Sequence, residues 1–220
     1  MGEEEEDDEI CKVVLLGESG VGKTCIISRF INNTFEDGLM STNGASYTSK
    51  NSTFPEYGNK TIKFEIWDTA GQERYRALTK MFYKDANAAI MVYDITRKDS
   101  FEELKNYWSE QIKESSPEGI ILVIAANKSD LFEHEAIDES IAREFAQQIG
   151  AFYIATSAKN SDGINNLFEE IAKKYTGSST ITIKKDEGDE PAVEEEKKDT
   201  VKITQNQKAE QKGKKKGGFC

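Results

Sequence analysis

The stretch GESGVGKTC, residues 17–25, decides how the rest of this 220-residue sequence is interpreted. It stands between the apolar runs CKVVLL and IISRFI, and it fits the pattern G-x-x-x-x-G-K-S/T through Gly17, Gly22, Lys23 and Thr24. In that pattern main-chain N–H groups wrap around a phosphate, the lysine adds a positive charge and the hydroxyl ligates Mg²⁺. The start of the following helix adds its dipole. We therefore predict a phosphate-binding loop rather than a glycine-rich turn with a chance GKT.

The order of the remaining segments indicates an α/β fold. Five apolar or alternating runs between residues 10 and 175 are typical of strands: CKVVLLG, NKTIKFEIW, ANAAIMVYD, GIILVIAAN and AFYIATSA. Amphipathic segments typical of helices are GKTCIISRFI, SFEELKNYWSEQI with a candidate cap at Ser100, IDESIAREFAQQIG and DGINNLFEEIAKKY. Alternation of strands and helices implies right-handed crossovers. We therefore predict an open, mostly parallel sheet with helices on both faces.

Four polar loops follow predicted strands, and in a parallel sheet such loops gather at one edge, where ligands bind. They are the glycine loop, WDTAGQE after KFEIW, NKSD after ILVIAA, and SAK after FYIAT. Taken alone, WDTAGQE is also typical of a turn and NKSD of a helix start. Their order and their place after strands favour a nucleotide-binding edge.

The tetrapeptide NKSD, residues 127–130, favours guanine over adenine. A carboxylate at Asp130 accepts two hydrogen bonds, from N1 and from the 2-amino group of guanine, whereas adenine offers no such pair of donors. A buried polar group left unpaired costs about 1–3 kcal/mol, and more when it is charged. Ala158 has a backbone N–H for the base oxygen, with Lys159 nearby. The sequence therefore predicts that GTP and GDP are the ligands.

With these motifs in place, the sequence resembles the small GTPases of the Ras superfamily over residues 10–175. The resemblance rests on GESGVGKT, Thr42, WDTAGQE, NKSD and TSAK, in the family's order. Within the superfamily the chain is similar to the Rab proteins through KFEIW (63–67), RYRALT (74–79), FYKDA (82–86) and YDIT (93–96), and KTIKFEIWDTAGQERY most resembles endosomal Rabs. This implies a P-loop GTPase domain with a six-stranded, mostly parallel sheet.

The resemblance also implies a role for each matching position. Thr24 and Thr42 would ligate Mg²⁺, and Asp68 would hold a metal-bound water. Gly71 would donate its N–H to the γ-phosphate, and Gln72 would orient the attacking water. The residues implied to contact the nucleotide, with Phe35 edge-on to the base, are Ser19, Gly20, Val21, Gly22, Lys23, Thr24, Cys25, Phe35, Thr42, Gly71, Asn127, Lys128, Asp130, Ser157, Ala158 and Lys159.

The sequence departs from the usual Rab pattern in the switch region and beyond it. Asn43 stands after the switch threonine, where a hydrophobic residue is usual, and Tyr47 lies nearby. We expect the loop between the second and third strands, SKNSTFPEYGNK (49–60), to be longer than usual. Asp85 replaces a glycine in FYKDA. No arginine matches a catalytic role within the chain, so an arginine finger is expected from a partner.

Charge is unevenly distributed along the chain, whose formal net charge is −11. Residues 1–9, MGEEEEDDE, carry seven carboxylates and predict a disordered acidic arm. Residues 10–176 are the predicted GTPase domain. From 177 to 220 the composition is rich in Lys, Glu and Gly and poor in aromatic residues, which predicts a disordered tail. The acidic domain argues against nucleic acid as a partner.

The chain ends in KGKKKGGFC, with Cys220 as the last residue. A prenylation box has its cysteine fourth from the end, so Cys220 matches none. We nevertheless expect a prenyl group at Cys220, with the preceding lysines as a second attraction to an anionic membrane surface. The alternative is an unmodified, solvated lysine tail.

Together these observations predict a monomeric GTP/GDP switch with slow, Mg²⁺-dependent hydrolysis that regulates vesicle traffic. Effectors, an exchange factor and a GTPase-activating protein would bind segments 35–48 and 69–82, and a GDP dissociation inhibitor would bind a prenylated form. The expected location is the cytoplasm and the cytosolic face of an intracellular membrane, with endosomes favoured. The alternatives are a Ras- or Rho-type signalling GTPase at the cell surface and a nucleotide-holding scaffold with little turnover.

Overall fold

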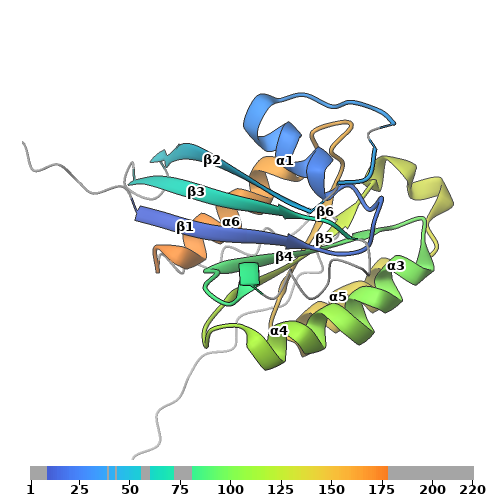
Figure 1. The fold of residues 1–220 in the computed structure, drawn as a ribbon. Coiled ribbons are helices and arrows are strands. Elements are labelled where there is room, and N and C mark those ends of the chain that lie inside the picture. The colour runs from blue at the N-terminus through green and yellow to red at the C-terminus, as the bar shows by residue number, and fades with distance from the viewer. Residues whose placement is uncertain (1–8, 39, 43, 56–59, 72–80, 178–220) are drawn as a thin grey trace, which may run out of the picture. The chain divides into compact units, whose positions relative to one another are not determined.

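The computed structural model describes residues 9–38, 40–42, 44–55, 60–71 and 81–177. Within these residues a sheet of six strands forms the centre of the fold (Figure 1). The strands are β1 (Glu9–Leu16), β2 (Ala45–Phe54), β3 (Lys60–Thr69), β4 (Ala88–Asp94), β5 (Ile121–Asn127) and β6 (Phe152–Thr156). Their spatial order is β2-β3-β1-β4-β5-β6, and every neighbouring pair is parallel except β2 with β3. The predicted six-stranded, mostly parallel sheet is confirmed.

Helices cover both faces of this sheet, as predicted (Figure 1). On one face lie α1 (Lys23–Asn32) and α6 (Ile164–Tyr175). On the other face lie α3 (Lys98–Glu103), α4 (Ser109–Ser115) and α5 (Glu139–Gln148). The π-helix η3 (Leu104–Trp108) joins α3 to α4, and the 3-10 helix η4 (Ser129–His134) follows β5.

Strand β1 supplies side chains to both hydrophobic cores. Successive side chains of a strand point to opposite faces, so Val13 and Leu15 join the core under α1 and α6. Val14 and Leu16 join the core under α3, α4 and α5. All four side chains are fully buried, which explains why this strand is apolar on nearly every residue. Because β1 lies between β3 and β4, the glycine loop that follows it emerges near the middle of the carboxyl edge of the sheet.

The helical segment after β4 differs from the sequence prediction. Its candidate cap, Ser100, is not the cap, because α3 already begins at Lys98 and has Arg97 in the N-cap position. The buried Ser100 hydroxyl instead donates to the carbonyl oxygens of Asp94, at 3.2 Å, and Arg97, at 2.7 Å. The predicted single helix also contains a π-helical turn.

The apolar face of the segment continues through that π-helical turn. The N–H of Ser109 donates to the carbonyl of Leu104, five residues earlier, where an α-helix would use a carbonyl four residues earlier. The residues of the predicted apolar stripe are all buried on the sheet side: Phe101, Leu104, Trp108 and Ile112.

The prediction of a long loop over residues 49–60 was wrong, because β2 and β3 form a hairpin there. Residues 49–54 belong to β2, which pairs with β3 from Ala45 opposite Thr69 to Phe54 opposite Lys60. The polar sequence of β2 hides this strand from a search for apolar runs, because β2 is an edge strand and most of its side chains are at least partly exposed. Asn43 lies outside the described residues, as do residues 1–8 of the predicted arm and residues 178–220 of the predicted tail.

Candidate functional site

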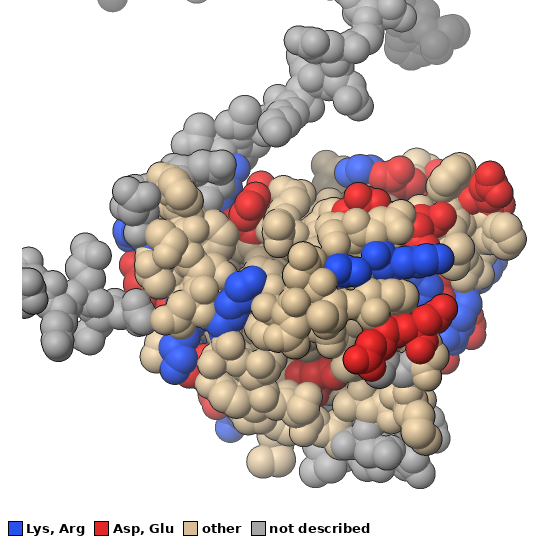
Figure 2. All heavy atoms as spheres, turned by 90° about the horizontal axis from the view of Figure 1, so that it is seen from above, with Lys and Arg blue, Asp and Glu red and all other residues tan. Residues whose placement is uncertain are grey.

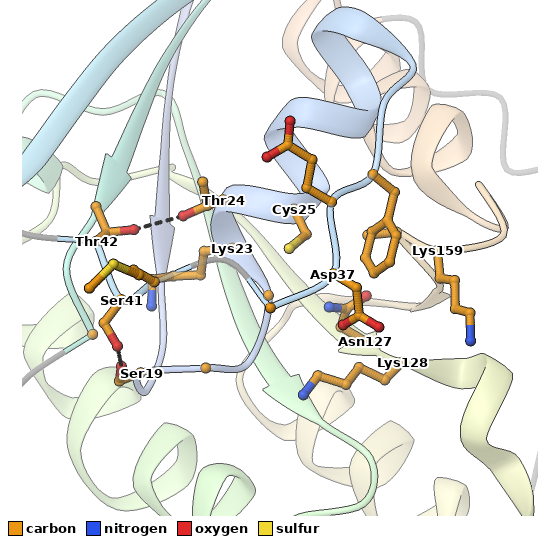
Figure 3. A pocket seen from close by; sticks show the side chains of 18 of the residues that line it. Ser19, Lys23, Thr24, Cys25, Asp37, Ser41, Thr42, Asn127, Lys128 and Lys159 are labelled. Carbon is orange, nitrogen blue, oxygen red and sulfur yellow. Dashed lines mark hydrogen bonds between the residues drawn. The ribbon is translucent and has the colours of Figure 1, made fainter.

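A cavity of about 450 Å³ opens at the carboxyl edge of the sheet (Figure 3). The predicted contact residues that line it are Ser19, Gly20, Gly22, Lys23, Thr24, Cys25, Phe35, Thr42, Gly71, Asn127, Lys128, Asp130, Ala158 and Lys159. Val21 instead packs in the core beneath, and Ser157 is buried behind Asp130. Gln72 lies outside the described residues. The sequence analysis did not anticipate that Glu36, Asp37, Gly38, Met40, Ser41 and Leu131 also line the cavity.

The glycine loop wraps around the ammonium group of Lys23. Its Nζ donates to the carbonyl oxygens of Gly17, at 2.8 Å, and Glu18, at 2.9 Å. The side chain is only 6% exposed, and burial lowers the pKa of Lys23 to about 8 despite nearby carboxylates. Loop and ammonium together form a positively charged cradle that matches a phosphate group.

Two positions around this cradle require glycine, because a Cβ atom there would clash with a neighbouring group. A Cβ on Gly22, whose φ is +97°, would lie 2.3 Å from the side-chain nitrogen of Asn127. A Cβ on Gly71 would lie 2.3 Å from the carbonyl carbon of Glu18. Gly71, which follows β3 and Ala70, therefore packs directly against the phosphate loop.

Beside the cradle, two threonines and one aspartate form an oxygen cluster. The Thr24 hydroxyl donates to Asp68 Oδ2 at 2.6 Å and lies 2.8 Å from the hydroxyl of Thr42. The other carboxylate oxygen, Asp68 Oδ1, is buried and has no hydrogen-bond partner among the described residues. Burial raises the pKa of Asp68, although the charge of Lys23 and the hydroxyls of Thr24 and Thr42 act in the opposite direction. Oxygen ligands with an unsatisfied buried carboxylate fit Mg²⁺, which is bound in such sites together with phosphate oxygens.

The loop after β5 is tied to the phosphate loop and to β6. Asn127 is buried; its amide nitrogen donates to the carbonyl of Val21 at 2.8 Å, and its amide oxygen accepts from Thr156 at 3.3 Å. Lys128 adopts a left-handed backbone conformation, with φ +65°, and its ammonium pairs with Asp94 at 2.6 Å. The 3-10 helix η4 starts at Ser129, so NKSD is a helix start as well as part of the site.

Asp130 is held in a fixed direction by the loop after β6. Its Oδ1 accepts a hydrogen bond of 2.6 Å from the hydroxyl of Ser157. Arg29, from α1, donates to the carbonyl oxygens of Ala158, at 2.8 Å, and Lys159, at 3.0 Å. The sequence motifs did not reveal the role of Arg29, because its partners are about 130 residues away along the chain.

Cys25 and Phe35 complete the wall of the cavity on the α1 side. Figure 3 shows Cys25 beside the cavity. Both side chains are half-buried. Burial raises the pKa of the Cys25 thiol, so this residue contributes as a small, neutral wall residue rather than as a thiolate.

Comparison with known proteins agrees with this architecture. The sequence profile of the Ras family matches residues 12–177. Human Ras-related protein Rab-22A is 45% identical over 163 residues, which are 74% of this chain and 82% of the relative. Rat Ras-related protein Rab-31 is 46% identical over the same shares of both chains. Ras-related protein Rab-5A of Dictyostelium discoideum is 43% identical over 169 residues, or 77% of this chain and 82% of the relative.

In the part of the chain that the structure describes, no helix has the length and apolar character that a membrane crossing requires.

The buried Lys23 predicts that GDP binding takes up protons near pH 8. Because burial lowers the pKa of Lys23 to about 8, roughly half of these side chains are neutral at that pH in the nucleotide-free protein. A bound phosphate favours the charged form and raises the pKa, so binding should take up about half a proton per molecule. Calorimetric titration with GDP and Mg²⁺ in two buffers of different ionisation enthalpy measures this uptake.

The same titration at pH 6.5 serves as the control, because Lys23 is then charged before and after binding. The uptake by Lys23 should vanish there, and any buffer dependence that remains should have the opposite sign, because it reports proton release from the terminal phosphate of GDP. A binding enthalpy that does not depend on the buffer at pH 8 would contradict the assignment of Lys23 as the buried phosphate partner.

Proposed function

This chain belongs to the Ras family as a Rab-type small GTPase, an enzyme that hydrolyses GTP to GDP in vesicle traffic, and we propose that the cavity is its guanine-nucleotide and Mg²⁺ site. The observation that carries the proposal is the convergence of the Lys23 cradle, the Thr24–Thr42–Asp68 oxygen cluster and Asp130 on one cavity. The cradle matches the phosphates of a nucleotide, the oxygen cluster its metal and Asp130 its base. Along the sheet edge the cradle after β1 lies between the cluster beside β3 and Asp130 after β5.

The base is selected by Asp130 in this proposal. The hydrogen bond from Ser157 occupies one carboxylate oxygen and fixes the plane of the group, so the carboxylate is oriented before a base binds. N1–H and the 2-amino group of guanine are the two donors it receives. Ala158 supplies its backbone N–H to the base oxygen, Phe35 packs edge-on to the ring, and Lys128 and Lys159 pack against the base through their alkyl stems.

Mg²⁺ would be held by the hydroxyls of Thr24 and Thr42, with Asp68 holding a metal-bound water. When bound, it neutralises charge that develops on the phosphate oxygens during hydrolysis. Gly71 donates its N–H to the γ-phosphate, and Gln72, which lies outside the described residues, orients the attacking water. Phosphoryl transfer depends on such positioning and charge stabilisation more than on covalent participation by the protein.

The γ-phosphate acts as the latch of a conformational switch. Thr42 and Gly71 belong to different segments, and each meets the phosphate end of the cavity. Contacts with the γ-phosphate hold both segments, and hydrolysis releases them. Effectors, an exchange factor and a GTPase-activating protein would therefore bind segments 35–48 and 69–82.

An aromatic cluster next to these segments supports protein partners. The rings of Tyr47 and Trp67 are 5.2 Å apart, and those of Trp67 and Phe82 are 4.9 Å apart, measured between centroids. Tyr47 is 49% exposed, and Met81 beside Phe82 is also exposed. On the face seen in Figure 2, basic and acidic side chains are interspersed among a larger area of other residues. The exposed Tyr47 and Met81 suit a protein partner, because aromatic residues and methionine are enriched at protein interfaces.

Membrane attachment is proposed through the tail, which lies outside the described residues. A prenyl group on Cys220 and the lysines before it would hold the protein at the cytosolic face of an intracellular membrane, with endosomes favoured. A GDP dissociation inhibitor would bind the prenylated form, and the domain itself would act as a monomer. Relatives of the Rab type disfavour the alternative of a Ras- or Rho-type enzyme at the cell surface.

Replacing Asp130 tests the guanine assignment. Asp130→Asn should weaken GDP binding by roughly 1.5–3 kcal/mol, because one charge-assisted pair of hydrogen bonds is lost. It should strengthen binding of xanthosine diphosphate, whose 2-oxygen accepts from the new amide. Competition titrations with both nucleotides measure the exchange of preference, and Asp85→Asn, at an exposed position before β4, is the matched control. Unchanged GDP affinity in Asp130→Asn would refute the base-reading role.

Replacing Gln72 tests the assignment of the catalytic residue. Gln72→Leu should bind GTP as the unchanged protein does but hydrolyse it at least about tenfold more slowly, which corresponds to ~1.4 kcal/mol in the barrier. Single-turnover hydrolysis of preloaded GTP measures the rate. Gln147→Leu, at an exposed position of α5, should keep the original rate. Equal rates in all three proteins would show that another group positions the water.

Replacing Cys220 tests the membrane anchor. Cys220→Ser should move the full-length protein from the membrane fraction to the cytosol, because the lysines alone attract the membrane only weakly and in a salt-dependent way. Intact mass spectrometry of the membrane-bound protein from its native cell should show the added prenyl mass. The mass of the bare polypeptide in that fraction would refute prenylation and would leave the lysines or a partner protein as the anchor.

A further inference from the structure

The phosphate loop carries a carboxylate, Glu18, in a site that we propose for a polyanion. Its side chain is 27% exposed, and its charge is one of those that act on the buried ammonium of Lys23. A carboxylate close enough to stabilise this ammonium is also close enough to repel phosphates bound to it. The loop therefore needs a counter-charge for Glu18 if it is to hold a triphosphate.

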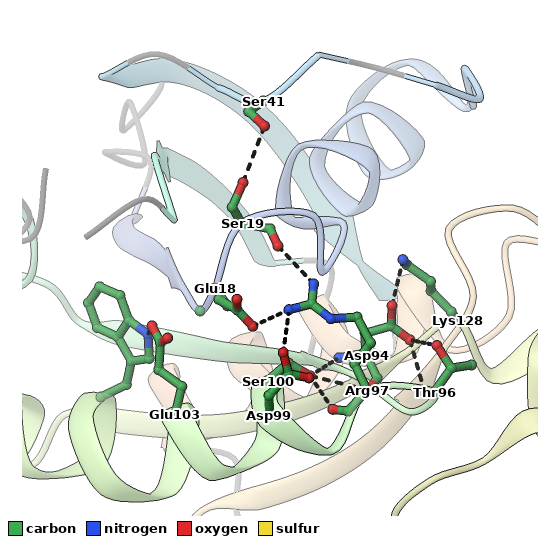
Figure 4. A network of polar contacts seen from close by, with 12 residues as sticks. Glu18, Ser19, Ser41, Asp94, Thr96, Arg97, Asp99, Ser100, Glu103 and Lys128 are labelled. Atoms are coloured by element: carbon green, nitrogen blue, oxygen red, sulfur yellow. Dashed lines mark hydrogen bonds and ion pairs between the residues drawn. The ribbon is translucent and has the colours of Figure 1, made fainter. Parts of the chain in front are cut away.

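Arg97 supplies that counter-charge from the turn between β4 and α3 (Figure 4). Its Nη2 pairs with Glu18 Oε2 and, at 3.0 Å, with Asp99 Oδ2. Its Nη1 donates to the carbonyl oxygen of Ser19 at 3.1 Å. A Cβ on Gly20 would lie 3.7 Å from the same nitrogen. The guanidinium group thus lies against three consecutive residues of the phosphate loop.

The contacts continue from Arg97 to the segment that carries Thr42. The Ser19 hydroxyl donates to the Ser41 hydroxyl at 3.2 Å, and Thr42 follows Ser41 directly. Ser19 and Ser41 both line the cavity, whereas Arg97 lies behind the loop. Arg97 therefore reaches the side of the phosphate loop that meets Thr42, rather than the side that meets the base.

We propose that Arg97 is a positioning residue that lets this site accept the third phosphate of GTP, by neutralising Glu18 and by fixing Ser19. The proposal rests on the guanine-nucleotide function proposed above. It implies that loss of Arg97 weakens GTP binding more than GDP binding. Without Arg97, Glu18 would lack its counter-charge and Ser19 would lose a hydrogen bond, and both residues lie in the phosphate loop. A purely structural support of the loop would affect both nucleotides alike.

The test compares how fast fluorescent GDP and a fluorescent non-hydrolysable GTP analogue dissociate from the full-length protein with Mg²⁺. Arg97→Ala should accelerate release of the GTP analogue about five- to tenfold and release of GDP by no more than about twofold. Arg97→Lys should give an intermediate rate, because lysine restores the charge but not the forked contact with Ser19 and Glu18. Arg143→Ala is the matched control, since Arg143 pairs with Glu139 on α5 and should leave both rates unchanged.

A second variant, Glu18→Gln, tests whether the charge of Glu18 causes the effect of losing Arg97. In the Arg97→Ala background it should return the release of the GTP analogue to within about twofold of the unchanged protein, because the repelling charge is gone. Alone, it should slow release of the analogue, and this variant keeps Arg97 bonded to Ser19 and Asp99. It therefore keeps the proposal testable if Arg97→Ala does not fold. Raising the salt concentration should reduce the excess release caused by Arg97→Ala.

Three results would overturn the proposal: equal acceleration of both nucleotides in Arg97→Ala, no acceleration of either, or no effect of Glu18→Gln. Failure of the proposed function is a separate outcome, because the unchanged protein would then bind neither fluorescent nucleotide.

Discussion

A single buried ammonium group, that of Lys23, governs the arrangement of the carboxyl edge of the sheet. A buried charge is costly unless it is hydrogen-bonded or paired, and the two acceptors here are carbonyl oxygens of Gly17 and Glu18. The loop must therefore curl back over the first turn of α1. Carboxylates of Asp68, Glu103 and Glu18 favour the charged lysine, yet burial still lowers its pKa. The cradle therefore suits a further negative charge, which a bound phosphate would supply.

The neighbouring loops are held to this cradle by side chains from distant elements. Asn127 at the end of β5 reaches Val21, Arg97 after β4 reaches Ser19, and Arg29 of α1 reaches Ala158 after β6. A hydrogen bond of this kind contributes about 0.5–1.5 kcal/mol net, so the edge is stabilised by several modest interactions. Together they preserve the spacing between the phosphate end and the base end of the cavity.

The segment that carries Thr42 is attached differently. Its described side-chain contacts run through hydroxyl groups: Ser41 with Ser19, and Thr42 with Thr24 and, at 3.5 Å, with Asp68. These partners belong to the phosphate loop, the first turn of α1 and the end of β3, which is where we propose that the phosphates and Mg²⁺ bind. Under the proposed function, the attachment of this segment would therefore depend on which nucleotide occupies the cavity. Arg97, which donates to Ser19 and caps α3, connects the phosphate loop to the start of that helix.

The local sequence was sufficient to predict most of the scaffold. Strands buried on both faces, such as β1 and β5, are apolar on nearly every residue, and the polar loops that follow them indicated the edge where a ligand binds. In contrast, β2 was not recognised as a strand of ten residues, because an exposed edge strand does not need an apolar pattern. The π-helical turn was not recognised either, because spacings of three and four residues between apolar side chains fit an α-helix equally well.

The sequence by itself determined which chemical groups are available at this edge: a glycine loop with its lysine, hydroxyls and a carboxylate that we propose for a metal, and a carboxylate that we propose for a base. Only the tertiary structure decided which side chains hold these groups in place. Arg97 and Glu18 are 79 residues apart, and Arg29 and Ala158 are 129 residues apart. Neither arginine belongs to a motif, and in its own segment each is a residue type that is common at solvent-exposed positions. Their partners are set by the order of the strands, because parallel crossovers bring the ends of β1, β4 and β6 to one edge.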